Sequence, residues 1–260
     1  MTDSLLESPR GAPTRALIAG QGVVGLPLAR RLGQAGVELL LCDFDTVSVA
    51  NLTKQLFNRD QVDSLKCEAT AELIAGHDPD LRVLAAPIDV RQLGIGAALE
   101  VDLIVGCPDN RAADMHCAAL AAAAGRPYVR LATSGADRGA EVRIFPPPRT
   151  EEQPCGACIF SPRDLTMIED QISCLGHDEF PEAGALTFAE HGSLAADIAA
   201  DSILRGEYEP ARSVRWFGGV HPVLDVTHLR RARGCKVGGL GGPHGESPWG
   251  PALAGETTTV

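Results

Sequence analysis

Short apolar runs alternate with segments of helical periodicity along most of this chain. The first apolar run, residues 16–19, is short enough to be a buried strand, and the glycine-rich segment 20–25 follows it at once. Apolar side chains then recur three or four positions apart up to Ala35, which is the spacing of one helix face. Pro27 in the first turn and Gly36 beyond the last turn suit the two ends of a helix. This region is therefore predicted to be a strand, a tight turn and a helix.

The same alternation continues through most of the remaining sequence. Further strands are predicted at residues 37–42, 81–85, 101–105, 127–131, 142–145, 214–217 and 223–229. Helical spacing predicts further helices at residues 62–73, 112–124 and 186–204. Strands that alternate with helices of this length are typical of a doubly wound, mostly parallel sheet with helices on both faces. The fold class is therefore predicted to be α/β.

Two segments depart from this alternation. Residues 149–184 are irregular, polar and cysteine-bearing, which is typical of a loop that crosses an active site. Residues 238–260 are rich in glycine and proline and are predicted to be disordered. Because 260 residues fall within the size range of one large α/β domain, we predict a single domain at residues 1–237.

Composition and charge narrow the function classes. No apolar run approaches the ~18 residues of a membrane span, and no secretory signal follows Met1, so a cytoplasmic location is expected. In that compartment cysteine pairs indicate metal or redox chemistry rather than disulfides. The net charge of −11 argues against nucleic acid as a partner, because a phosphate backbone would be repelled. The cysteines in or beside apolar segments are expected in the core: Cys42, Cys67, Cys107 and Cys117.

The first predicted turn has the pattern of a phosphate-binding site. Gly20, Gly22 and Gly25 permit a tight turn and a close approach of the backbone to phosphate. The helix that follows offers free N–H groups and a partial positive charge. Asp43 ends the next predicted strand at the ~20-residue spacing expected of an acid that binds ribose hydroxyls. These features alone fit NAD, FAD or ATP.

Further polar motifs follow in a fixed order. They are Asp43-Phe44-Asp45, Asn51-Leu52-Thr53-Lys54-Gln55, Lys66, Asp109-Asn110, Cys155-Gly156-Ala157-Cys158 and Cys174. Together with the glycine-rich turn, this set resembles the E1-like activating enzymes of the ThiF and MoeB type, over residues 16–235. The resemblance implies a Rossmann-like, mostly parallel sheet with antiparallel strands at its C-terminal end, and a homodimer. It also implies ATP-dependent adenylation of the C-terminal carboxylate of a small ubiquitin-like or sulfur-carrier protein.

The resemblance also implies roles for individual residues. Lys54 and Lys66 would supply positive charge to the phosphates, and Asp109 would hold Mg²⁺ or the attacking group. Cys174 would form a covalent bond with the activated carrier after adenylation. The residues that would bind ATP are Gly20, Gly22, Gly25, Asp43, Asp45, Asn51, Gln55 and Asn110. Simpler alternatives remain for three of these motifs. Lys66 would be a solvated lysine, Asp109-Asn110 would cap the next helix, and Cys174 would be an ordinary loop thiol.

A zinc site is implied by the same resemblance. Relatives hold structural Zn²⁺ with two CxxC pairs, and Cys155 and Cys158 form the first pair. The second pair is incomplete: it begins with Cys235, but Gly238 stands where its second cysteine would be. The fourth ligand would then come from His221, His228, His244 or Cys174. The alternative is a reducible thiol pair without metal.

Other functions stay open, because the glycine turn alone also suits an oxidoreductase and because the sequence departs from the family pattern. Lys54 stands where relatives have arginine, and the arginine usual in the helix after Asp109-Asn110 is displaced. Relatives that form dimers often insert an N-terminal arginine into the partner's site, for which Arg10 or Arg15 would have to serve here. The alternatives are adenylation of a ribosomal peptide C-terminus, a Rossmann oxidoreductase, and a non-catalytic scaffold derived from the family.

Overall fold

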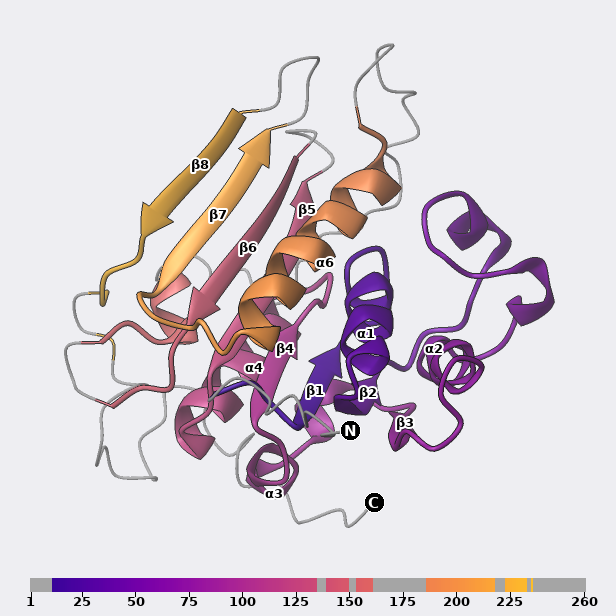
Figure 1. Ribbon diagram of the computed structural model, residues 1–260, viewed down its shortest axis with the longest axis horizontal. Helices are drawn as coiled ribbons and strands as arrows, with labels where there is room; N and C mark the ends of the chain where they lie inside the picture. The colour runs from indigo at the N-terminus through magenta and orange to yellow at the C-terminus, as the bar shows by residue number, and fades with distance from the viewer. Residues whose placement is uncertain are drawn as a thin grey trace, which may run out of the picture.

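The sheet is the framework of the molecule (Figure 1). The computed structural model describes residues 11–134, 139–149, 153–160, 186–217, 223–232 and 235. Eight strands form one sheet in the order β3-β2-β1-β4-β5-β6-β7-β8. Their bounds are β1 (Arg15–Ala19), β2 (Glu38–Cys42), β3 (Val83–Ala86), β4 (Leu103–Gly106), β5 (Tyr128–Ser134), β6 (Gly139–Phe145), β7 (Arg212–Phe217) and β8 (Val223–His228). Strands β1 to β5 are parallel, whereas β6, β7 and β8 pair antiparallel with their neighbours. The predicted fold class is therefore confirmed.

Helices cover both faces of this sheet. Their bounds are α1 (Gly25–Gln34), α2 (Lys66–Ala75), α3 (Ile95–Leu99), α4 (Arg111–Ala124) and α6 (Phe188–Leu204). Short 3-10 helices are η1 (Val49–Thr53), η2 (Arg59–Gln61), η3 (Val90–Gln92) and η4 (Gly156–Ile159). The apolar sides of α1, α2 and α6 share one core with the sheet, and those of α3 and α4 share a second core on the opposite face. Figure 1 shows α6 lying across the sheet beside α1.

Most predicted elements are present within a few residues of their predicted bounds, but the predicted start of one helix was wrong. The helix expected at residues 62–73 begins only at Lys66. Leu65 forms an isolated antiparallel bridge with Thr46, which requires an extended backbone and delays the helix. Asp63 has a φ of 71°, so the chain also turns sharply just before that bridge. Helix α3 was missed because its five residues are too few to show a period.

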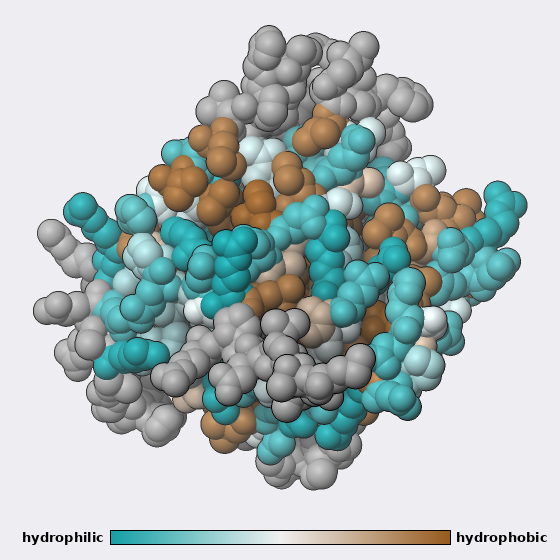
Figure 2. Space-filling model, viewed as in Figure 1, coloured by the Kyte–Doolittle hydropathy of each residue, from teal (hydrophilic) through white to brown (hydrophobic). Residues whose placement is uncertain are grey.

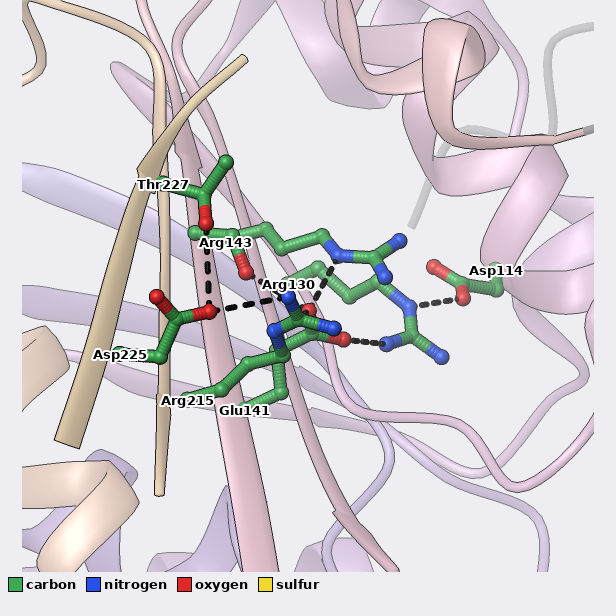
Figure 3. A network of polar contacts seen from close by, with 8 residues as sticks. Asp114, Arg130, Glu141, Arg143, Arg215, Asp225 and Thr227 are labelled. Atoms are coloured by element: carbon green, nitrogen blue, oxygen red, sulfur yellow. Dashed lines mark hydrogen bonds and ion pairs between the residues drawn. The ribbon is translucent and has the colours of Figure 1, made fainter. Parts of the chain in front are cut away.

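The antiparallel strands β6 to β8 present two different faces. On the α6 side, Val142 and Val214 are buried, and they belong to alternating apolar positions. Figure 2 shows apolar side chains gathered over α6, β7 and β8, and the exposed ones include Leu194, Leu224 and Val226. On the opposite side the same strands carry charged side chains, among them Glu141, Arg215 and Asp225 (Figure 3). This half of the sheet is therefore polar on the face that α6 leaves uncovered.

Several predictions concern chain that the structure does not describe. They are Cys174, His221, His244, most of the crossing loop at residues 149–184, and the tail at residues 238–260. Within the described ranges, no helix is long and apolar enough to cross a membrane. Of the cysteines expected in the core, Cys42, Cys67 and Cys117 are buried, whereas Cys107 is only partly buried.

Candidate active site

The parallel strands β2, β1 and β4, at the centre of the sheet, have their carboxyl ends side by side. Ala19, at the end of β1, pairs with Cys42 of β2 on one side and with Gly106 of β4 on the other. The chain moves from β1 to β2 in one direction and later returns to the other side of β1 as β4. Ligands of open α/β sheets bind in the crevice at such a switch point. The predicted site residues after these strands are thereby brought to one edge.

Two glycines of the phosphate turn are required by the backbone itself. Gly20 has a φ of +89°, and a Cβ there would lie 2.6 Å from the carbonyl oxygen of Cys107. Gly25 opens α1, and a Cβ there would lie 1.9 Å from the carbonyl oxygen of Gly20. Such contacts are impossible without moving the backbone. The turn therefore holds the N-terminus of α1 close behind the strand edge, as an anion site requires.

We expect Gly25→Ala to lower the free energy of unfolding by about 3 kcal/mol and to abolish ATP binding, because the new methyl group meets backbone that cannot yield. Thermal unfolding and calorimetric titration with ATP measure the two effects. The control is Gly76→Ala, since Gly76 has ordinary helical dihedrals and a Cβ there lies no closer than 3.5 Å to its neighbours. Normal ATP binding by Gly25→Ala would contradict this account of the turn.

Asp43 links the end of β2 to the phosphate turn. Its carboxylate accepts hydrogen bonds from the backbone N–H groups of Gln21, at 2.6 Å, and Asp45, at 2.8 Å. Burial raises the pKa of the Asp43 carboxyl, while the Gln21 N–H group and the charge of Lys66 oppose that rise. Asp43 thus lies beside the glycine turn, where its predicted role in binding ribose requires it to be.

Lys66 is held in place by an ion pair. It is the first residue of α2 and is only 8% exposed. Its Nζ lies 2.7 Å from Oδ2 of Asp45, and its backbone N–H donates to the Asp45 carbonyl oxygen at 2.8 Å. The alternative of a solvated surface lysine is therefore wrong. A fixed ammonium group stands next to the strand-end acids.

The polar loop of residues 51–55 folds toward the glycine turn. Oδ1 of Asn51 accepts hydrogen bonds from the backbone N–H and the hydroxyl of Ser48, at 2.8 and 3.0 Å, and so closes the short helix η1. Lys54 ends η1, and Gln55 follows it. Nε2 of Gln55 lies 3.6 Å from the position that a Cβ on Gly22 would take. The loop therefore lies beside the turn.

A small buried apolar cluster holds the two ends of this polar loop. Val47 and Phe57, which flank the loop, are buried together with Leu26 of α1 and Ala69 of α2. This cluster explains why the loop returns to the glycine turn instead of extending into solvent.

Asp109 and Asn110, which follow the end of β4, differ in their surroundings. Oδ1 of Asn110 accepts a hydrogen bond from the backbone N–H of Ala113 at 2.8 Å, so Asn110 caps α4. Asp109 is exposed and lies between the end of β4 and the start of α4. The capping alternative thus holds for Asn110, and Asp109 is exposed just after the end of β4.

Three cysteines form a separate cluster. The Sγ atom of Cys155 lies 3.9 Å from that of Cys158 and 3.7 Å from that of Cys235, and all three sulfurs lie within 4.8 Å of one another. Tetrahedral Zn²⁺ with Zn–S bonds of ~2.3 Å would separate its sulfur ligands by ~3.8 Å. The spacing therefore fits zinc at three corners. Among the residues described, no fourth histidine, cysteine or carboxylate joins this cluster.

A buried ion pair near the start of α4 was not predicted from the sequence. Nε of Arg130 donates to Oδ2 of Asp114, and the hydroxyl of Tyr128 donates to the other carboxylate oxygen. Asp114 is 3% exposed. An aspartate in an alanine-rich helix and an arginine within a predicted strand were the signals that could have revealed this pair. Burial raises the pKa of Tyr128, and the neighbouring Asp114 adds to the rise.

Comparison with known sequences agrees with this geometry. Residues 12–195 match the ThiF family. The chain is 30% identical, over 234 residues, to the sulfur carrier protein ThiS adenylyltransferase of Escherichia coli, with 87% of this chain and 86% of that protein covered. It is also 30% identical to the molybdopterin-synthase adenylyltransferase of the same organism, with 87% of each chain covered. A ubiquitin-like modifier-activating enzyme 5 from rice matches at 31% identity over 38% of this chain and 27% of its own length.

Solved structures share the fold over a similar length. Escherichia coli MccB in complex with ATP superposes with a TM-score of 0.64 at 19% identity, covering 87% of this chain and 67% of MccB. A structure of MccB with AMPCPP and MccA gives the same TM-score. At this identity the likeness concerns the fold alone. The sequence match across most of the chain goes further: the protein belongs to the ThiF family, as an adenylyltransferase of the ThiF and MoeB type.

Proposed function

We propose that this protein adenylates the C-terminal carboxylate of a small ubiquitin-like or sulfur-carrier protein, with ATP as the nucleotide donor. The observation that carries the proposal is that the polar loop lies beside the glycine turn, with Gln55 near Gly22 and Lys66 fixed beside Asp45. A dinucleotide site needs the glycine turn and the ribose acid but has no use for this loop or lysine.

The proposed step is a displacement at the α-phosphorus of ATP. A carboxylate oxygen of the carrier attacks phosphorus and forms the new P–O bond, and the bond to the bridging oxygen breaks. The leaving pyrophosphate takes the electron pair of that bond. Because two anions are brought together, catalysis requires positioning and positive charge more than proton transfer.

The residues at the strand edge can meet these requirements. The ammonium group of Lys66 is held at the edge by Asp45, and Lys54 belongs to the polar loop beside the turn. The exposed carboxylate of Asp109 offers the oxygen ligand that Mg²⁺ prefers. When bound, Mg²⁺ would neutralise charge on the phosphates. Asp43 and Asp45 would orient the nucleotide and Lys66, respectively.

Exchange of labelled pyrophosphate into ATP tests this function, since exchange requires reversible formation of the adenylate. We expect exchange only when a protein ending in Gly-Gly with a free carboxylate is present. Exchange supported by a short peptide alone would favour the peptide-modifying alternative. Retained ATP binding without exchange for any partner would favour the scaffold and contradict the proposal.

We also propose that Cys155, Cys158 and Cys235 bind structural Zn²⁺. The sulfur spacing and the soft thiolate ligands support zinc over a hard cation. The site would join η4 to the segment beyond β8, where a side-chain N–H group of Arg231 donates to the carbonyl oxygen of Gln153 at 3.1 Å. His228 is among the candidate fourth ligands within the described residues, but it does not join the cluster.

We expect Cys158→Ser to lower bound zinc to well below one ion per chain and to lower the free energy of unfolding by several kcal/mol, since metal binding stabilises only the folded site. Elemental analysis of purified protein and thermal unfolding with and without a chelator measure both effects. Cys67→Ser in α2 is the control for loss of a thiol, and its zinc content should match the unmodified protein. A wild-type protein without zinc, whose stability ignores the chelator, would contradict the proposal.

Two further predictions belong to this function. Cys174 would accept the activated carrier as a thioester or pass on sulfur, so Cys174→Ala should leave pyrophosphate exchange intact.

A homodimer is expected by analogy with the family, and light scattering on the purified protein measures it directly.

A further inference from the structure

The first turn of α6 lies between the glycine turn and the antiparallel half of the sheet. Gly192 packs directly on the glycine turn, because a Cβ at this position would collide with the carbonyl oxygen of Val23. Val23 belongs to that turn and stands just before α1 begins. Figure 1 shows α6 beside α1, and an ion pair between Arg31 and Asp197 joins the two helices further along. Movement of the first turn of α6 would therefore move the backbone of the glycine turn.

His191, the neighbour of Gly192, fixes this end of α6 to the sheet. Nε1 of Trp216, in β7, donates a hydrogen bond to Nδ1 of His191 at 2.9 Å. The two rings also stack, with their centroids 6.4 Å apart and their planes at 29°. Both residues are 2% exposed, so water cannot replace this hydrogen bond. One turn of helix therefore contacts β7 through His191 and the glycine turn through Gly192.

The hydrogen bond from Trp216 also sets the protonation state of His191. An indole N–H group only donates, so Nδ1 must hold a free lone pair, and the proton of the neutral ring lies on Nε2. Nε2 is enclosed and has no hydrogen-bond partner within the described part of the chain. A second proton on His191 would place two N–H groups against each other and would bring a charge into a buried site.

The surroundings of His191 disfavour its charged form. The positions of β5 and β6 that share a core with α6 are apolar and include Leu131, Ala140 and Val142. Burial lowers the pKa of the His191 imidazole, and the charge of the preceding Glu190 opposes that shift. On α1 and α6 the charges of Arg31 and Asp197 neutralise each other. The ring is therefore neutral near neutral pH and becomes charged in acid.

We propose that His191 is a positioning residue for ATP, because its hydrogen bond with Trp216 holds the first turn of α6 against the glycine turn in the conformation that binds the phosphates. The inference rests on the proposed function in taking ATP as the nucleotide at that turn. Protonation of His191 breaks the hydrogen bond, so Gly192 and the backbone of Val23 lose their fixed position. ATP binding therefore requires neutral His191.

Calorimetric titration with ATP at several pH values tests the proposal. We expect the affinity of the wild-type protein to fall about fivefold from ~pH 7.5 to ~pH 5.5, since the fraction with neutral His191 decreases over this range. His191→Asn should keep the wild-type affinity at the higher pH, because its amide oxygen can accept from Trp216, and should lose most of the weakening in acid. His191→Leu offers no acceptor and should bind ATP about tenfold more weakly at both pH values.

Thermal unfolding over the same pH range gives a second readout. The pKa of His191 is lower in the folded protein than in the unfolded chain. The stabilisation from the Trp216 hydrogen bond is therefore complete above the ordinary histidine pKa of ~6.5 and is lost as the pH falls through the lower, folded value. His191→Asn should lack this loss, and the same measurement shows whether each variant is folded.

The comparison of wild type with His191→Asn isolates this one group. Asp43 titrates as well, because burial raises its pKa, but its contribution is common to both proteins. The difference between the two pH profiles therefore belongs to His191. The control is His77→Asn, which replaces an exposed histidine just beyond α2 and should give the wild-type profile.

A wild-type affinity for ATP that does not change with pH would overturn the proposal. So would an equal weakening in acid for folded His191→Asn protein, and so would wild-type affinity in His191→Leu. If His191→Leu does not fold, the His191→Asn comparison still decides. Pyrophosphate exchange with a Gly-Gly-ended carrier tests the proposed function separately. The expected pH profile without any exchange would remove adenylation and leave His191 as a positioning residue, whereas exchange with pH-independent ATP binding would remove the role of His191 alone.

Discussion

Replacement of Asp109 by alanine is expected to reduce pyrophosphate exchange by about 10³-fold while the protein stays folded. The carboxylate is exposed at the end of β4, so it contributes little to the core, and its loss should change the free energy of unfolding by less than ~1 kcal/mol. The loss of activity should be large, because the acid would hold Mg²⁺ against phosphates whose charge increases during the reaction. Exchange rate and thermal unfolding are measured on the same preparation.

Asp80→Ala is the matched control for this variant. Asp80 is also an exposed aspartate, but it lies before β3, at the amino end of the parallel strands and therefore away from the crevice. It should retain full exchange. If Asp109→Ala kept wild-type exchange, or lost exchange only because it unfolded, the role assigned to Asp109 would be wrong.

Replacement of Lys66 by alanine is expected to reduce exchange by about a hundredfold, with little change in stability. Lys66 is 8% exposed and its Nζ is fixed 2.7 Å from Oδ2 of Asp45, which suits a charge that acts on phosphate without rearrangement. Asp45 keeps a 48% exposed side chain, so water can solvate it after the lysine is removed, and the cost in stability should stay below ~1 kcal/mol. Exchange kinetics at saturating ATP, together with thermal unfolding, separate the two effects.

Arg31→Ala provides the comparison. Arg31 lies in the last turn of α1 and is also an ion-paired cation, since it pairs with Asp197 of α6. That pair is at the opposite end of α1 from the glycine turn, so exchange should be unaffected. Equal losses in both variants would mean that Lys66 acts only through general packing.

The strand and helix order was predictable because apolar periodicity is a local property. The glycine turn, the strand-end position of Asp43 and the CxxC pair were all evident in the sequence, and the structure places each at the expected point. The start of α2 was not predictable, because the bridge between Leu65 and Thr46 is a tertiary contact that overrides helical spacing.

The pairing of side chains across strands was also beyond the sequence. Arg130 and Asp114 are separated by a helix and a turn, and only the packing of α4 on β5 brings them together. Arg215 meets Glu141 through a strand register that no local pattern encodes. Lys66 could be interpreted as solvated or as functional; its ion pair with Asp45 excludes the solvated alternative, and its role at the phosphates stays a prediction.

The most direct test of the central claim is intact-protein mass spectrometry of a Gly-Gly-ended carrier protein after incubation with this enzyme, ATP and Mg²⁺. We expect the carrier to gain the mass of one adenylyl group at its C-terminus, and a carrier without the terminal glycine to stay unmodified. A carrier whose mass stays unchanged with wild-type enzyme that binds ATP would contradict the account.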